Sequence, residues 1–229
     1  DFMDILGIDE AGRGSVLGPM VIAGVVVPEK MEKVLGRMGV TDSKRLTANR
    51  RTILSRKLKK MFEYDIIIIS AREIDEMRAD GINLNEIEKN AMEELILRLK
   101  PEKAIVDAVD VKAERFQENL KKDTGFDVIA EHKADDTYIQ VSAASIIAKA
   151  ERDAQIALAE GKAKSIRMVY EAEAEGLERL NKSQPTDQIL RMKSIEAMKD
   201  IAEDVLEVGD DMKEDIADVV ANISDAIAS

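Results

Sequence analysis

Short apolar runs rich in β-branched residues most constrain what the first part of this chain can fold into. Such runs are typical of buried strands, and they predict strands at residues 5–8, 21–27, 65–70, 103–107 and 127–130. Pro28 ends the second of these strands. Between the strands, helices are expected after Thr47, from Asn83 or Asn85 to residue 99, over residues 111–122, and from residue 138 onward. This alternation predicts an α/β fold.

From residue 154 the pattern is helical only. A heptad-like seam runs along it at Ile156, Ala159, Ala163, Ile166 and Tyr170. Pro185 begins another helix that reaches about residue 208, Gly209 caps it, and a last helix has an apolar face at Met212, Ile216, Val220, Ile223 and Ile227. Residues 154–229 carry 9 Lys and Arg against 17 Asp and Glu, a net charge of −8. We therefore divide the chain into domains 1–153 and 154–229.

Composition excludes several kinds of site. With no cysteine, the chain has no disulfide, thiolate metal site or thiol nucleophile. With a single histidine, His132, it has no multi-histidine metal site. A metal ion must then be held by carboxylates, which suits Mg²⁺ or Mn²⁺. No apolar run approaches the roughly 20 residues of a membrane span, and no secretory signal is visible, so we expect no membrane partner and a cytoplasmic location.

Carboxylates stand where the predicted strands end. Asp9 and Glu10 follow the first strand, Asp107 ends the fourth, and Asp135 follows the fifth. Because neighbouring side chains on a strand point to opposite faces, we expect Asp9 and Glu10 to serve one site only if the chain turns there, as Gly12 permits. Ligands gather at the carboxyl ends of strands in open α/β sheets, so these groups can converge on a pair of divalent ions. Each Asp taken alone is more often a helix cap or turn residue, so the prediction depends on the group and above all on Asp9 with Glu10.

A dense basic cluster follows the second strand. Its members are Lys44, Arg45, Arg50, Arg51, Arg56, Lys57, Lys59 and Lys60. It is either a groove for nucleic acid or a solvated helix face. The net charge of the whole chain, −12, argues against binding that depends on the charge of nucleic acid alone.

Five sequence blocks, in this order and spacing, resemble archaeal ribonuclease HII over roughly residues 2–153. They are Gly7-Ile8-Asp9-Glu10-Ala11-Gly12-Arg13-Gly14, Gly18-Pro19, Asp42-Ser43-Lys44, Glu131-His132-Lys133-Ala134-Asp135, and Ala143-Ala144-Ser145-Ile146-Ile147-Ala148-Lys149 with Glu151-Arg152-Asp153. The resemblance implies a ribonuclease H-like fold, a mixed five-stranded sheet flanked by helices. It also implies a metal-dependent endonuclease that cleaves the RNA strand of RNA–DNA hybrids and cuts at ribonucleotides in duplex DNA.

The resemblance also assigns roles to residues. Asp9, Glu10, Asp107 and Asp135 correspond to the metal-binding catalytic carboxylates. Residues 12–14 correspond to the turn that recognises the 2′-hydroxyl, the group by which a protein tells RNA from DNA. Lys44 would hold a substrate phosphate and His132 would shuttle protons or contact the nucleic-acid backbone, although both are equally ordinary structural residues.

The second part of the chain departs from this family. The family continues with a Gly-Ser-Gly-Tyr-Pro-Ser-Asp-like turn, whose tyrosine packs on a sugar, and this chain has none. Tyr170 lies at about the right distance, yet its neighbours are helical, which favours a position in the seam. Residues 159–202 weakly resemble the helical region of stomatin- and flotillin-like proteins, which assemble through coiled coils.

Two classes of function remain open at this point. The first is the endonuclease, with weakened activity because the tyrosine turn is missing. The second is a self-associating helical scaffold, or an engineered fusion, that carries an inactive nuclease-like body. In either case the apolar stripes of the C-terminal helices must be covered, either by folding back on the nuclease-like body or by a second chain in a homo-oligomer.

Overall fold

A computed structural model describes residues 3–13, 18–182 and 187–206. The chain forms two compact units, residues 1–157 and 158–229. The first unit holds all the strands, and the second consists of helices in its described part. The predicted helix over residues 212–227, Pro185 and the Gly209 cap lie outside the described residues.

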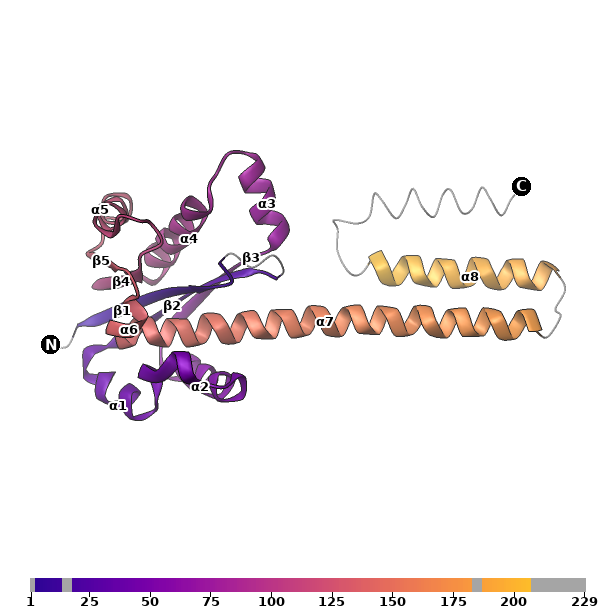
Figure 1. Ribbon diagram of the computed structural model, residues 1–229, viewed down its shortest axis with the longest axis horizontal. Coiled ribbons are helices and arrows are strands. Elements are labelled where there is room, and N and C mark those ends of the chain that lie inside the picture. The colour runs from indigo at the N-terminus through magenta and orange to yellow at the C-terminus, as the bar shows by residue number, and fades with distance from the viewer. Residues whose placement is uncertain (1–2, 14–17, 183–186, 207–229) are drawn as a thin grey trace. The chain divides into compact units, whose positions relative to one another are not determined.

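The first unit is built on a mixed five-stranded sheet (Figure 1). Its strands are β1 (Asp4–Ala11), β2 (Met20–Pro28), β3 (Tyr64–Ile69), β4 (Lys103–Asp107) and β5 (Val128–Glu131), in the order β3-β2-β1-β4-β5. Strand β1 pairs antiparallel with β2 and parallel with β4, while β2–β3 is antiparallel and β4–β5 parallel. The five predicted strands are confirmed, with β1 three residues longer at its C-terminal end than expected.

Helices and two 3-10 turns connect the strands, and α6, α7 and α8 follow the last strand. Their bounds are η1 (Glu29–Met31), α1 (Glu32–Arg37), η2 (Val40–Arg45), α2 (Ala48–Met61), α3 (Ala71–Ala79), α4 (Leu84–Leu99), α5 (Ala113–Thr124), α6 (Ala134–Thr137), α7 (Ile139–Lys182) and α8 (Asp187–Leu206). Thr47 and Asn83 cap α2 and α4 by accepting backbone N–H groups of Arg50 and Glu86. The sequence interpretation did not include α3, although a Ser70–Glu73 capping box begins it.

Helices lie on both sides of the sheet (Figure 1), and alternating side chains of the strands build the two larger of three cores. On one face, Leu6 and Ile8 of β1 pack with residues of α4 and α5. On the other face, side chains of β2 pack against α1, α2 and the first turns of α7, where residues 143–148 are buried. Leu54 and Leu58 of α2 are buried in this second core, whereas Met61, the last residue of α2, is exposed.

Helix α7 is continuous from the sheet into the second unit. It passes through residue 154, where the sequence interpretation put a domain boundary. Of the seam residues, Ala159, Ala163 and Tyr170 are exposed. Among the described residues, no helix is both long enough and apolar enough to cross a membrane.

Candidate active site

The site begins at the carboxyl end of β1, with Asp9 and Glu10. Strand β1 continues to Ala11, so the expected turn at these residues is wrong. Their side chains leave opposite faces of the strand. Asp9 lies on the face that α7 covers, where Ser145 is its neighbour, and Glu10 lies on the α4 face, near Glu88. No turn is needed at Asp9 and Glu10, because their carboxylate oxygens reach each other from the two faces of the strand.

Three carboxylates meet there. Oxygen atoms of Asp9, Glu10 and Asp107 all lie within 4.8 Å of one another. Asp107 is the last residue of β4, which runs parallel to β1, so both strands deliver their acidic residues to the same edge of the sheet. The backbone N–H of Ala134 donates to Asp107 at 3.2 Å. Oxygen ligands in this number suit a hard divalent cation.

Asp135 lies beside this group, not within it. It belongs to the short helix α6, is buried, and its carboxylate lies 3.4 Å from the Lys44 ammonium. Its charge reaches the cluster, since it raises the pKa of Asp107. Lys44 also contacts Asp136, at 2.5 Å. The structure thus brings Asp135 and Lys44, two residues predicted for the site, into contact with each other.

Burial and mutual repulsion make the carboxyl groups weak acids. Burial, then the charges of Glu88 and Asp107, raises the pKa of Glu10 to about 7. Burial and the neighbouring Glu10 raise the pKa of Asp9 well above its usual value, against a lowering by the Ser145 hydroxyl. Burial is also the main reason that the pKa of Asp107 is raised. A divalent cation would relieve this repulsion.

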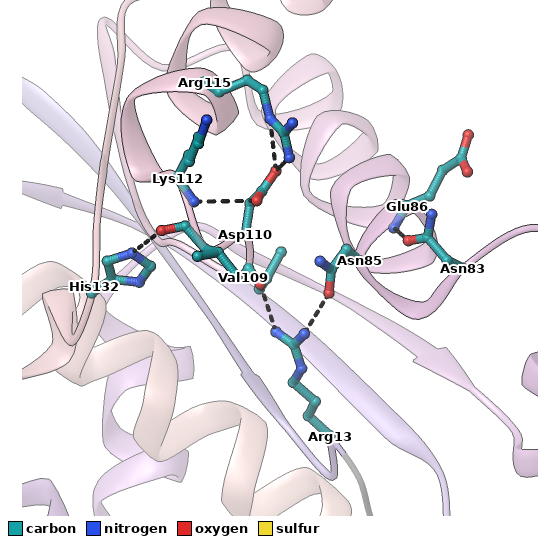
Figure 2. Close-up of polar contacts among 10 residues, drawn as sticks. Arg13, Asn83, Asn85, Glu86, Val109, Asp110, Lys112, Arg115 and His132 are labelled. Carbon is teal, nitrogen blue, oxygen red and sulfur yellow. Dashed lines mark hydrogen bonds and ion pairs between the residues drawn. The ribbon is translucent and has the colours of Figure 1, made fainter.

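The turn after β1 is anchored through Arg13. Gly12 has a φ of +96°, and a Cβ there would lie 2.5 Å from the Pro19 carbonyl oxygen, so only glycine fits. The Arg13 guanidinium donates to the Val109 carbonyl at 3.2 Å and to the Asn85 side chain at 2.5 Å (Figure 2). Gly14, the third residue of the predicted turn, lies outside the described residues.

The two other residues predicted to bind substrate, His132 and Tyr170, are not part of the carboxylate cluster. His132 is exposed, and its Nε2 atom lies 3.3 Å from the Val111 carbonyl oxygen (Figure 2). Tyr170 belongs to the second unit and has 43% of its side chain exposed.

A pocket opens between the Gly12 turn and α7. It is lined by Glu10, Ala11, Gly12, Arg13, Arg51, Lys149, Arg152 and Asp153. Arg51 belongs to the basic cluster and pairs with Asp153 at 2.8 Å. Cations next to the carboxylates suit a phosphodiester backbone.

Glu88 is a site neighbour that the sequence interpretation missed. It lies on α4 between buried Ile87 and Ala91, and its own side chain is fully buried. The available signal was a carboxylate inside the apolar stripe of an amphipathic helix.

Comparisons with known proteins agree with this geometry. The family model described as Ribonuclease HII matches residues 6–193. Ribonuclease HII of Methanobrevibacter smithii is 77% identical over 155 residues, which cover 68% of this chain and 75% of the relative. The chain belongs to the ribonuclease HII family. Ribonuclease HII of Methanosphaera stadtmanae is 54% identical over 68% of this chain and 74% of its own length.

Solved structures of ribonuclease HII show the same fold. The structure of the PCNA:RNase HII complex from Archaeoglobus fulgidus has a TM-score of 0.66 and 45% identity, over 70% of this chain and 78% of that one. Ribonuclease H2 from Pyrococcus horikoshii has a TM-score of 0.66 and 37% identity, over 77% and 89%. The ribonuclease H-like fold is therefore confirmed. None of these matches supports the resemblance to stomatin or flotillin, and the ribonuclease HII family model extends 40 residues past residue 153.

Proposed function

We propose that this ribonuclease HII, a hydrolytic endonuclease acting on RNA–DNA hybrids, also cuts duplex DNA at embedded ribonucleotides and uses Mg²⁺ or Mn²⁺. The observation that carries the proposal is the convergence of Asp9, Glu10 and Asp107 within 4.8 Å at one sheet edge. We assign the catalytic domain to residues 1–153 and the helical segment to 154–229. A nucleic-acid substrate favours action in the cytoplasm.

The donor set fits a divalent cation. Oε2 of Glu10 is buried and accepts no hydrogen bond from the described residues, so it has a free ligand position. Asp9, Glu10 and Asp107 would hold the ion, with Asp135 completing the site. When bound, divalent ions supply Lewis-acid stabilisation of the charge that develops on the phosphodiester. A structure of Bst-RNase HIII holds Mn²⁺, and that protein, 20% identical with a TM-score of 0.62 over 72% of this chain and 55% of its own, shares the fold.

The remaining residues would bind and orient the substrate. The Gly12–Arg13 turn would approach the ribose, because glycine allows its backbone close to a ligand. Lys44, which is half exposed beside Asp135, would hold a phosphate next to the cut. His132, which is exposed after β5, would contact the nucleic-acid backbone. Because the tyrosine turn is absent, we expect slower cleavage and weaker selection of the junction.

Cleavage of a labelled DNA duplex with one ribonucleotide, in Mn²⁺ or Mg²⁺, tests the proposal. We expect one cut next to the ribonucleotide, no cut in the all-DNA duplex, and at least a hundredfold loss in Asp9→Asn, on the order of other losses of transition-state charge stabilisation. The alternative of an inactive body predicts no cleavage by the unsubstituted chain. Equal cleavage of the all-DNA duplex would contradict recognition of the ribose.

A further inference from the structure

Glu88 is a buried carboxylate that the assigned chemistry does not use. Its side chain is 0% exposed, on the α4 face that packs against the sheet. Neither of its oxygens accepts a hydrogen bond from a described residue. Burying a carboxylate in this way is costly unless a cation lies beside it.

The cation beside it is Arg13. Nη1 of Arg13 lies 3.1 Å from Oε2 of Glu88, while 35% of the Arg13 side chain stays exposed. The guanidinium thus reaches from the turn after β1 to α4, where Glu88 provides charge and Asn85 a hydrogen-bond acceptor one helical turn earlier. Val109, after β4, completes the set of acceptors (Figure 2).

The three contacts hold the Arg13 guanidinium in different ways. Asn85 and Val109 offer neutral acceptors, which fix direction, and Glu88 offers the one acidic group among the three. Burial raises the pKa of Glu88 to about 7, and the charge of Arg13 opposes this rise and favours the carboxylate. Charge-assisted contacts are about twice as strong as neutral ones. Holding a long, flexible arginine in one geometry before substrate arrives reduces the ordering cost of binding.

We propose that Glu88 is a positioning residue that holds Arg13, and so presets the Gly12–Arg13 turn for the ribose-containing strand. The inference rests on the proposed recognition of a 2′-hydroxyl by this turn. Glu88 acts through Arg13 and does not touch the substrate.

A double-mutant cycle tests this link. The variants are Glu88→Gln, Arg13→Ala and their combination, and Glu86→Gln, an exposed position on the same helix, is the matched control. Steady-state kinetics on the single-ribonucleotide duplex in Mn²⁺ give kcat and KM. Fluorescence anisotropy of the same duplex and of its all-DNA form, in a chelator, gives binding without cleavage.

We expect Glu88→Gln to raise KM about tenfold with kcat within twofold, the size expected from losing one charge-assisted contact. Binding of the all-DNA duplex should not change, and the melting temperature should not fall, because glutamine keeps the shape and removes a buried charge. Since Glu88 acts through Arg13, the double variant should bind no worse than Arg13→Ala, and Glu86→Gln should behave as the unsubstituted chain.

Three results would overturn the inference. They are an unchanged KM in Glu88→Gln, additive losses in the double variant, and a fall in kcat or melting temperature with KM unchanged, which is the mark of a purely structural residue. If the unsubstituted chain neither cuts nor selectively binds the ribonucleotide duplex, the proposed function itself fails. These outcomes are distinguishable because the first three require a functioning unsubstituted chain.

Discussion

The charged forms of Asp9, Glu10 and Asp107 destabilise the folded protein. Each carboxylate is poorly solvated because it is buried, and each lies beside another acidic group, so its pKa is raised. Such a cluster persists because the surrounding sheet and helices over-determine its geometry, and a bound cation would stabilise it further. Two measurements follow from this arrangement, one with metal removed and one with metal added.

Without metal, the chain should lose stability as pH rises through the range that Glu10 titrates. Its pKa is about 7 in the fold against 4.5 in the unfolded chain, so the folded state binds more protons between these values. Stability from this group is complete below pH 4.5 and is lost as pH approaches 7. The loss is on the order of 3 kcal/mol. Urea unfolding in chelator at pH 5 and pH 8, for the unsubstituted chain and Glu10→Gln, measures it.

Glu10→Gln removes the titrating group, so its stability should fall less between the two pH values than that of the unsubstituted chain. The comparison cancels groups whose pKa is lowered in the fold, such as Glu73 and Asp110, because both proteins carry them. Equal falls in the two proteins would show that Glu10 is not the group responsible.

Adding Mg²⁺ or Mn²⁺ should raise the melting temperature at pH 7. An ion that binds only the folded state stabilises it by about 2.7 kcal/mol at a hundred times its Kd. Asp107→Asn removes a charge from the cluster and should weaken calorimetric metal binding at least tenfold. Asp75→Asn, an exposed position on α3, is the control. Equal binding by Asp107→Asn and the unsubstituted chain would contradict the site.

At this scale the sequence predicts the carboxylates well, for a physical reason. Asp9, Glu10 and Asp107 lie in the last residues of apolar strands, and the parallel pairing of β1 with β4 places them at one sheet edge. Glu88 could not be found this way, since its role depends on Arg13, 75 residues earlier in the chain, and only the packing of α4 on the sheet brings them together.

At the scale of the elements, the close contact between β1 and the start of α7 places Asp9 next to Ser145. Gly7 makes it possible: a Cβ there would lie 2.2 Å from the Gln140 carbonyl carbon and oxygen and 2.5 Å from the Val141 nitrogen. These are backbone atoms of a helix that packs its buried first turns on the sheet, so they cannot move aside as a flexible side chain can.

Gly7→Ala should therefore destabilise the protein by more than the 1–3 kcal/mol usual for overpacking, and should lower activity because α7 moves away from Asp9. Urea unfolding measures the first effect and ribonucleotide cleavage the second. Gly36→Ala is the control, since nothing lies within 4 Å of its added Cβ and alanine favours the helix α1. It should leave the protein as stable or slightly more stable. A Gly7→Ala protein as stable as the Gly36→Ala protein would rule out the close contact.

Strands and caps were predictable from the sequence, because apolar runs, Thr47 and Asn83 act locally. The length of α7 was less so. Its buried residues end at Ala150 and the composition changes near residue 154, but no proline or glycine lies in residues 139–160, so the helix continues. It also runs through Gly161 and Gly176, because a glycine inside a helix weakens it without having to end it.

At the scale of the whole molecule, the two units differ in how many of their large apolar side chains are exposed. The first unit buries its large apolar residues in three clusters around the sheet. In the described part of the second unit, many such residues are exposed: Leu158, Met168, Val169, Tyr170, Ile189, Met192, Ile195 and Met198. The net charge of −8 over residues 154–229 disfavours nucleic acid as their partner.

We therefore expect the chain to associate with a second copy of itself through these helices, because that would cover the exposed apolar side chains. Light scattering at micromolar concentration should show more than a monomer. Met192→Glu with Ile195→Glu should shift the chain toward the monomer, because each places a charge where apolar area would be covered. Lys199→Gln changes the charge of the same helix in the same direction without touching an apolar residue, and should leave the assembly unchanged. If the full chain is monomeric, and the body of residues 1–157 melts at the same temperature with and without the tail, the helices have no structural role and the expectation fails.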